Sequence, residues 1–386
     1  MTAADAARAR RGDRADRPVV VVFGGPSAEH DVSIVSGTAI AEALASDGAA
    51  VEQVLIDLGG QWWGLPTDHR RADRSAAAYD DPAALSAQGP LGIGDALSGL
   101  TARTDQPVVF IALHGPFGED GTVQAVLESA GLAYTGSGVA ASALGMDKAL
   151  FKRMCRGLGL PVVDWREVRA DRWARDEALV RAELAAFASG ATTGDPRLMV
   201  KPAGLGSSVG MTLVHDLAQL GPALADAFRY DDLVLVETYL AGARDLEVAV
   251  IGNDPAGLEV YGPGEIVSGH EFYDYAAKYT PGLSETSTRA EVSDSQRALL
   301  HKLSRDVYRA IGAEGFARID FLVAGERVVV SEINTIPGFT PISLFPTLPA
   351  DGGYTFVEVC RRIVDLAVER HSGRPSRSLR PDDLPR

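Results

Sequence analysis

Two oxygen-bearing side chains lie two residues apart at the end of an apolar run, Glu332 and Asn334 in "RVVVSEINT". Side chains alternate along a β-strand, so both are predicted to leave one face of a strand. Val329, Ser331 and Ile333 are then expected on the opposite face. Two hard oxygen ligands would therefore share one surface.

A second run repeats this spacing. In "FARIDFLV", Arg318 and Asp320 lie two residues apart, and a short turn around "AGER" joins this run to the first. If the two faces coincide, Asp320, Glu332 and Asn334 form an all-oxygen cluster beside a guanidinium. Such a cluster suits Mg²⁺ bound to phosphates better than zinc. The alternative is a hairpin of two half-exposed strands without a metal.

A glycine-rich loop lies between two apolar runs in "RLMVKPAGLGSSVGMTLV". The pattern predicts a hairpin whose tip, with Ser207 and Ser208, presents backbone N–H groups and hydroxyls that could wrap phosphates. An ordinary surface turn is the alternative. Lys201 favours the phosphate interpretation, because a lysine at the end of an apolar strand is costly unless it meets an anion.

Composition narrows the class of protein. The chain has 386 residues, 46% of them hydrophobic, and a net charge of -15, which argues against nucleic acid as a partner and favours small substrates. Its two cysteines, Cys155 and Cys360, lie in apparent helices and fit a reducing cytosol. No apolar run is long enough to span a membrane, and residues 1–17 and 371–386 are expected to be disordered.

The elements that must position these side chains begin with a parallel sheet. "VVVVFGG" is typical of a strand buried on both faces, and apolar residues at helical spacing follow it. "QVLIDL", a loop insertion with some helix at about 66–106, and "VVFIAL" continue the pattern. Ligands bind at the carboxyl ends of such strands, which here carry "GGPSAEHD" and "HGPFGEDG". The first segment lacks the spaced glycines of a dinucleotide fingerprint.

The second half is predicted to be a mixed, mainly antiparallel α+β region. Asp147 is expected to cap a helix in which Leu150, Phe151 and Met154 form an apolar stripe opposite Lys and Arg. The strands "DLVLVETYL", "DLEVAVIG" and "GLEVYGPGEIV", a helix at 295–311 and the opening hairpin follow. The fold class is therefore α/β and α+β.

Together these parts form an ATP site without a Walker loop or protein-kinase motifs. The stretches "GGPSAEHDVS", "LHGPFGEDGTVQ", "YTGSGV", "ALGMDK", "KPAGLGSSVG", "FYDYAAKY", "ARIDF" and "EINTIPGFTPISL" resemble, in order, the motifs of D-alanine:D-alanine ligases. The resemblance implies an ATP-grasp fold with an N-terminal Rossmann-like parallel-sheet domain. It divides the chain into an N-terminal domain at 18–138, a central lid at 139–237 and a C-terminal domain at 238–370.

The resemblance implies ATP-dependent ligation of two D-alanine molecules through a D-alanyl phosphate, for peptidoglycan synthesis. It implies two Mg²⁺ or Mn²⁺ ions per site, held by Asp320, Glu332 and Asn334, and it allows K⁺ as an activator. Asp245 takes a place where many relatives carry a ribose-binding Glu. The residues expected to bind ATP are Lys148, Lys201, Ser208, Glu237, Leu240 and Asp245.

At the amino-acid end the resemblance places the ammonium of the first D-alanine at Glu29 and the oxyanion at Arg318 and the N–H of Gly338. Ser207 and Tyr279 are expected to hydrogen-bond with Glu29. Relatives often read "EAKY" where this chain has "AAKY" at 276–279. The residues expected to bind substrate are His114, Lys278, Ser343 and Leu344.

The resemblance further implies a cytoplasmic homodimer that binds neither nucleic acid nor a membrane. Two alternatives remain open from the sequence. One is a depsipeptide ligase that joins D-alanine to D-lactate, against which Tyr279 argues, because such relatives commonly carry phenylalanine or a rearranged segment there. The other is a nucleotide-binding module without turnover, against which the oxyanion donor Arg318 argues.

Overall fold

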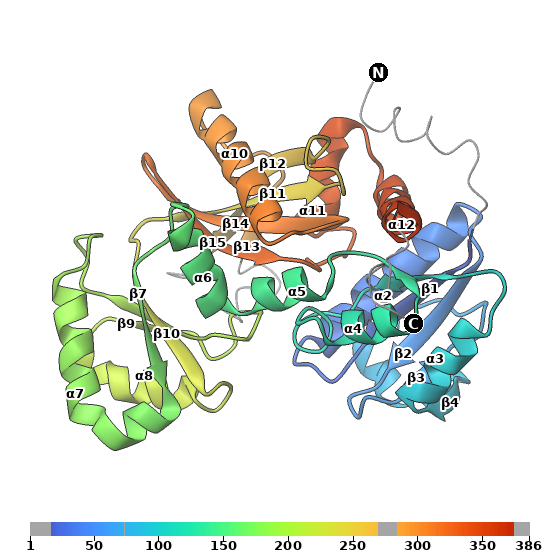
Figure 1. Ribbon diagram of the computed structural model, residues 1–386, viewed down its shortest axis with the longest axis horizontal. Coiled ribbons are helices and arrows are strands. Elements are labelled where there is room, and N and C mark those ends of the chain that lie inside the picture. The colour runs from blue at the N-terminus through green and yellow to red at the C-terminus, as the bar shows by residue number, and fades with distance from the viewer. Residues whose placement is uncertain (1–16, 73, 269–283, 374–386) are drawn as a thin grey trace, which may run out of the picture.

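The computed structural model of the chain describes residues 17–72, 74–268 and 284–373. Within these ranges the strands form three sheets, which lie in three lobes of the molecule (Figure 1). None of the helices in the described ranges is long and apolar enough to cross a membrane. The site is built where the three lobes meet, so the fold is described lobe by lobe.

The N-terminal sheet has the strand order β4-β3-β2-β1-β5-β6, in which β2, β1, β5 and β6 are parallel. Its first strand is buried throughout and leads into a helix, as predicted. The segment at 66–106 contains helix, as expected, and also an edge strand that was not predicted. The elements are β1 (Val19–Gly24), α2 (His30–Ser46), β2 (Val51–Ile56), β3 (Trp62–Gly64), 3-10 helices at Ala76–Asp80 and Pro82–Leu85, β4 (Gln88–Leu91), α3 (Ile93–Thr101), β5 (Val108–Ile111), α4 (Thr122–Ser129) and β6 (Ala133–Tyr134).

The second sheet has the order β7-β10-β8-β9 and is antiparallel. Two helices, α7 and α8, cover it with an apolar core of their own. The predicted glycine-rich hairpin is confirmed as β8 and β9, whereas β7 and α7 were not predicted. The elements are β7 (Trp165–Arg169), α7 (Ala170–Ser189), β8 (Leu198–Pro202), β9 (Thr212–Val214), a 3-10 helix at Leu217–Gln219, α8 (Leu220–Ala227) and β10 (Leu233–Thr238).

The third sheet has the antiparallel order β13-β12-β11-β14-β15. Helices α5 and α6 run through the centre of the molecule beneath it, and α12 returns to pack against α2 (Figure 1). The elements are α5 (Val139–Met146), α6 (Lys148–Gly157), β11 (Arg244–Ile251), β12 (Glu259–Ser268), β13 (Ser284–Ser287), α10 (Asp294–Ala310), β14 (Phe316–Ala324), β15 (Arg327–Asn334), α11 (Leu344–Thr347), a 3-10 helix at Leu348–Gly352 and α12 (Phe356–Gly373).

A β-bulge in β15 changes the predicted alternation of side chains. Asp320 pairs with Glu332, but Phe321 pairs with Val330, so Ser331 is an extra residue without a partner on β14. Val330 and Ile333 therefore lie in one apolar cluster although they are three residues apart. The prediction that Val329, Ser331 and Ile333 share a face was wrong. The prediction that Glu332 and Asn334 share a face of the strand was correct.

Helix α6 also buries a different face from the predicted one. Asp147 caps it, as expected, by accepting hydrogen bonds from the N–H groups at positions 149 and 150. Leu150, however, is 44% exposed, while Lys152 is fully buried beside Phe151. The prediction of an apolar stripe with Lys and Arg on the opposite face was therefore wrong. The reason is electrostatic, because the buried lysine finds a carboxylate on the neighbouring sheet.

Candidate functional site

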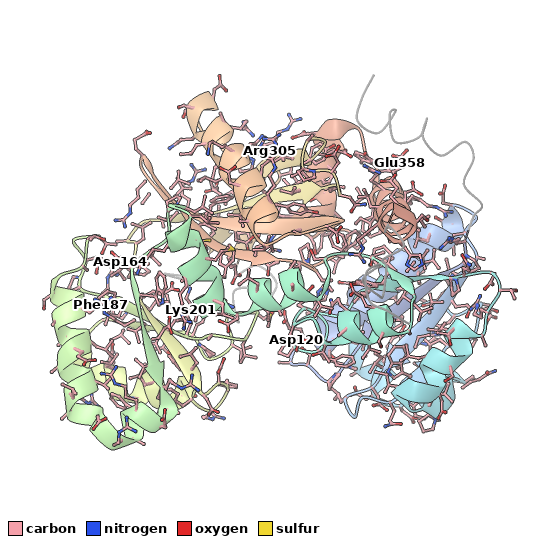
Figure 2. All side chains as sticks on the ribbon, in the orientation of Figure 1. Asp120, Asp164, Phe187, Lys201, Arg305 and Glu358 are labelled. Carbon is pink, nitrogen blue, oxygen red and sulfur yellow. The ribbon has the colours of Figure 1, made fainter. Side chains whose placement is uncertain are left out.

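A cleft of about 150 Å³ lies between the second and third sheets. Its walls carry most of the residues expected to bind ATP and metal. Lys201 lies on β8, an inner strand of the second sheet, on the side of that lobe nearest α6 (Figure 2). The predicted residues that line the cleft are Lys148, Lys201, Ser208, Glu237, Leu240, Asp245, Arg318, Asp320 and Glu332.

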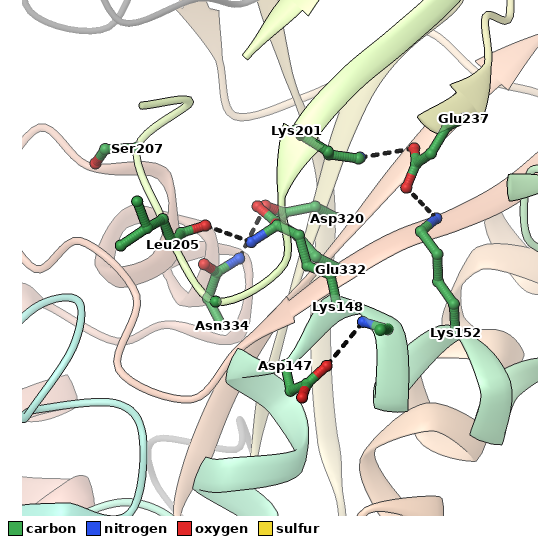
Figure 3. Close-up of polar contacts among 12 residues, drawn as sticks. Asp147, Lys148, Lys152, Lys201, Leu205, Ser207, Glu237, Asp320, Glu332 and Asn334 are labelled. Carbon is green, nitrogen blue, oxygen red and sulfur yellow. Dashed lines mark hydrogen bonds and ion pairs between the residues drawn. The ribbon is translucent and has the colours of Figure 1, made fainter. Parts of the chain in front are cut away.

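A buried carboxylate with two lysine partners closes one wall of this cleft. The Oε2 atom of Glu237 lies 2.7 Å from Lys201 Nζ, and its Oε1 atom lies 3.0 Å from Lys152 Nζ. Figure 3 shows the carboxylate between the two amino groups. Burial opposes ionisation of Glu237, but the two lysines outweigh it and lower its pKa. Burial lowers the pKa of Lys152, and the charge of Glu237 opposes that shift.

Lys148 lies at the first position of α6, one turn before Lys152. Its Nζ donates to the carbonyl oxygen of Leu205 at 2.5 Å and lies 3.5 Å from Glu332 Oε2 (Figure 3). Leu205 belongs to the tip of the glycine-rich hairpin. The lysine thus links α6, the hairpin and the third sheet, at a place where all three face the cleft.

The predicted oxygen cluster is assembled by the register of the third sheet. Asp320 lies opposite Glu332, and Arg318 lies opposite Asn334. Arg318 donates two hydrogen bonds of 2.7 Å to Asp320, and Asn334 Nδ2 donates to Asp320 Oδ2 at 2.9 Å. Two carboxylates and a carboxamide fit a magnesium or manganese ion and not zinc.

Arg318 has a second acidic partner that sequence reasoning missed. Glu247 on β11 lies opposite Asp320 in the sheet, and its Oε2 lies 3.2 Å from Arg318 Nε. Both acids raise the pKa of Arg318 well above its usual value, although burial opposes this. The signal was available, because Glu247 follows Asp245 by two residues on a predicted strand.

The hairpin tip reaches the N-terminal lobe. Ser207 Oγ donates a short hydrogen bond to Glu29 Oε1, and both Ser207 and Ser208 have positive φ, 51° and 57°. A Cβ at Gly206 would lie 2.8 Å from Glu29 Oε2, so a larger residue there would push the carboxylate of Glu29 aside. The structure therefore brings the predicted pair Glu29 and Ser207 into contact.

Two further side chains behind Glu29 are buried and tightly bonded. His114 Nδ1 lies 3.0 Å from the carbonyl oxygen of Ile336, and Nε2 lies 2.9 Å from Ser36 Oγ. Both ring nitrogens are therefore occupied, and burial lowers the pKa of His114. Glu119 was not predicted; burial and the nearby Glu29 raise its pKa to about 8.

Three more predicted residues, Gly338, Ser343 and Leu344, lie between the end of β15 and the start of α11. Ser343 Oγ accepts from the N–H of Thr340 at 3.1 Å. The side chain of Leu344 is buried in the apolar core, so a ligand could reach only its backbone. Gly338 is half-buried. Lys278 and Tyr279 lie outside the described residues.

Lys152 is the clearest functional candidate that the sequence analysis missed. Lys148 and Lys152 are four residues apart and therefore share one face of a helix. That spacing would have indicated two inward lysines. The sequence analysis instead assigned Leu150, Phe151 and Met154 to the buried face, because these residues are apolar.

Comparisons with known proteins agree over nearly the whole chain. The families described as "D-ala D-ala ligase N-terminus" and "D-ala D-ala ligase C-terminus" match residues 18–137 and 154–365. A D-alanine--D-alanine ligase of Kineococcus radiotolerans is 39% identical over 376 residues, covering 92% of this chain and 97% of the relative. One of Streptomyces avermitilis is 36% identical over 92% of this chain and 95% of its own length.

Solved structures give the same result. The D-alanine-D-alanine ligase of Coxiella burnetii is 30% identical, with a TM-score of 0.73 over 93% of this chain and 96% of that one. The VanG D-Ala:D-Ser ligase of Enterococcus faecalis is 26% identical, with a TM-score of 0.76 over 92% of this chain and all of that one.

Proposed function

The chain belongs to the D-alanine--D-alanine ligase family, and we propose that it uses ATP to join two D-alanine molecules into D-alanyl-D-alanine for peptidoglycan synthesis. Its fold is the ATP-grasp fold of these ligases, as the resemblance implied. The observation that carries the proposal is the hydrogen bond between Ser207 and Glu29. It joins the phosphate hairpin to the acid assigned to the amino-acid substrate.

In the first step the carboxylate of one D-alanine attacks the γ-phosphorus of ATP, which forms an acyl phosphate and releases ADP. Lys148 and Lys201 bind the phosphates, and Glu237 and Leu240 receive the adenine, with Asp245 at the ribose. A divalent ion held by Asp320, Glu332 and Asn334 would neutralise phosphate charge. The amino groups of both lysines already lie at the cleft, which supports this assignment.

In the second step the neutral amine of the other D-alanine attacks the acyl carbon, and the phosphate leaves with the electron pair of the broken C–O bond and with the proton that the nitrogen loses. Negative charge develops on the carbonyl oxygen, where Arg318 and the N–H of Gly338 stabilise it. Glu29 binds the ammonium of the first D-alanine. The second one is bound at Ser343 and the backbone of Leu344, and the family motif assigns Lys278 to the same substrate and Tyr279 to a hydrogen bond with Glu29.

The finer assignments belong to the same proposal. They are two Mg²⁺ or Mn²⁺ ions with K⁺ as an activator, a homodimer in the cytoplasm, and the division at 18–138, 139–237 and 238–370. The oxygen-only donor set supports the choice of ions.

Phosphate release with ATP and Mg²⁺ tests the function directly. D-alanine, L-alanine, D-serine and D-lactate are offered singly and in pairs, and the products are separated by chromatography. We expect D-alanine alone to support turnover and D-alanyl-D-alanine to be the main product in every mixture that contains D-alanine. If D-alanyl-D-lactate is the main product instead, the depsipeptide alternative is correct. If no acceptor leads to phosphate release, the result supports a nucleotide-binding module without turnover.

A further inference from the structure

The turn that follows β15 is held by side chains at nearly every backbone N–H. It runs over residues 336–340 and contains Pro337, which has no N–H. Among the described residues no hydrogen bond reaches the N–H of Gly338. The three other N–H groups donate as follows: Ile336 to Glu119 Oε1 at 3.1 Å, Phe339 to Ser36 Oγ at 3.4 Å and Thr340 to Ser343 Oγ at 3.1 Å.

The carbonyl group of Ile336 is held as well, by His114. A carbonyl oxygen can only accept, so Nδ1 of His114 carries the hydrogen. Burial favours the neutral ring, so Nε2 accepts the hydroxyl hydrogen of Ser36. The oxygen of Ser36 is then free to accept from the N–H of Phe339. The series of hydrogen bonds therefore runs in one direction, from the N–H of Phe339 through Ser36 and His114 to the carbonyl oxygen of Ile336.

The residues that grip the turn belong to a different lobe from the turn itself. Ser36 lies on α2, and His114 and Glu119 lie on the loop after β5, which Glu119 also ties by accepting from the N–H of Gly115 at 2.8 Å. All three side chains are at most 8% exposed. Burying such groups costs free energy that an apolar contact would not, so packing alone does not account for them.

We propose that Ser36, His114 and Glu119 are positioning residues that fix the 336–340 turn and so aim the N–H of Gly338 at the oxyanion. The inference rests on the proposed ligase function, in which this N–H stabilises the tetrahedral intermediate. It reassigns His114, which acts through the turn and not by binding substrate.

We call the side chains of Ser36, His114 and Glu119 the clamp. The test compares variants that keep or remove one of its hydrogen bonds. Ser36→Ala removes the acceptor of the Phe339 N–H, and His114→Leu removes the donor to the Ile336 carbonyl, whereas His114→Asn keeps an N–H near the position of Nδ1. We expect the first two to lower kcat/KM for D-alanine by about 10- to 100-fold, because a displaced donor costs about that much. The Kd of ATP should stay within about twofold, and His114→Asn should recover most of the activity. Equal losses in the two His114 variants would overturn the proposal.

A second measurement separates positioning from a structural role. The probe is a dipeptide analogue with a tetrahedral phosphinate at the reacting carbon, which resembles the intermediate that the Gly338 N–H contacts. Its affinity should fall by the same factor as kcat/KM across the variants. Loss of activity with unchanged affinity for the analogue would contradict the inference. If His114→Leu does not fold, Ser36→Ala carries the same comparison.

The two proposals fail in different ways. If the wild-type protein releases no phosphate with D-alanine, the ligase function itself is wrong. If the wild type is active and Ser36→Ala and His114→Leu match it in kcat/KM, only the clamp is wrong.

Discussion

At the proposed nucleotide end of the site three lysine side chains gather around Glu237 and Glu332, whereas at the proposed amino-acid end Glu29 and Glu119 lie near each other. Among the described residues, neither of these two acids forms an ion pair. Their partners are a hydroxyl and backbone N–H groups.

The difference shows that the lysines gather where phosphates are proposed to bind, and that the acids without an ion pair among the described residues lie where the ammonium group is proposed to bind. Phosphates would meet the lysines, and an ammonium group would meet the carboxylates. Burial raises the pKa of Glu119 to about 8, and the nearby Glu29 adds to the shift. Variants at each end should therefore affect different substrates.

The largest effect is expected from Asp320→Asn or Glu332→Gln, which removes a carboxylate of the proposed metal site. Since such a site supplies several kcal/mol of transition-state stabilisation, kcat should fall by about 10³-fold or more. Phosphate release at millimolar Mg²⁺ measures it. Glu326→Gln, in the exposed turn of the same hairpin, is the matched control and should behave like wild type. Near-normal turnover in either site variant would remove the metal assignment.

Lys152→Met sharpens the comparison at the nucleotide end. It leaves the buried Glu237 with Lys201 as its remaining ion-pair partner. The free energy of unfolding should fall by about 3 kcal/mol, the lower part of the range for breaking a buried pair. The KM for ATP should rise while the KM for D-alanine changes little. Denaturant unfolding and initial rates measure both effects.

Lys302→Met is the control for Lys152→Met, because Lys302 forms an exposed pair with Asp306. Exposed pairs contribute about 0–1 kcal/mol, so its stability should be nearly unchanged. If the two lysine variants lose equal stability, the buried triad has no special role.

The amino-acid end is tested by the pH dependence of stability in Glu119→Gln. The pKa of Glu119 is raised in the folded state, so the folded protein holds a proton that the unfolded chain releases between about pH 4.5 and 8. Its contribution to stability is present below that window and is lost as the pH rises through it. Relative to the variant, the wild type should lose up to about 1.4 kcal/mol per pH unit there. Parallel stability curves for the two proteins would contradict the raised pKa.

The smallest effect concerns the hairpin that joins the two ends. Amides at 203–210 should exchange about tenfold more slowly when a non-hydrolysable ATP analogue and Mg²⁺ are added, because the ligand orders the tip. Ser207→Ala lacks the hydroxyl bonded to Glu29, so its free form should exchange faster than the wild type. Protection that does not change with nucleotide would favour an ordinary surface turn.

Much of this arrangement was predictable from local pattern. Residues two apart on strands placed Asp320 beside Glu332, and the glycine-rich loop between apolar runs predicted the β8–β9 hairpin. The bulge at Ser331 was not predictable, because an extra residue in one strand is defined only by its pairing partner. The buried face of α6 was misassigned for a similar reason, since Lys152 is stable inside only where Glu237 meets it.

The amino-acid sequence by itself determined the family, the first strand and helix of the N-terminal sheet, the β8–β9 hairpin and the residue types gathered around the cleft, because periodicity and motif spacing are local properties. The tertiary structure decided which charges are paired, which carboxylates lie together, and which side chains grip the 336–340 turn. Some of those features join segments more than 200 residues apart, as in the hydrogen bond between His114 and Ile336. Their free energies depend on burial and distance, which no local stretch of sequence contains.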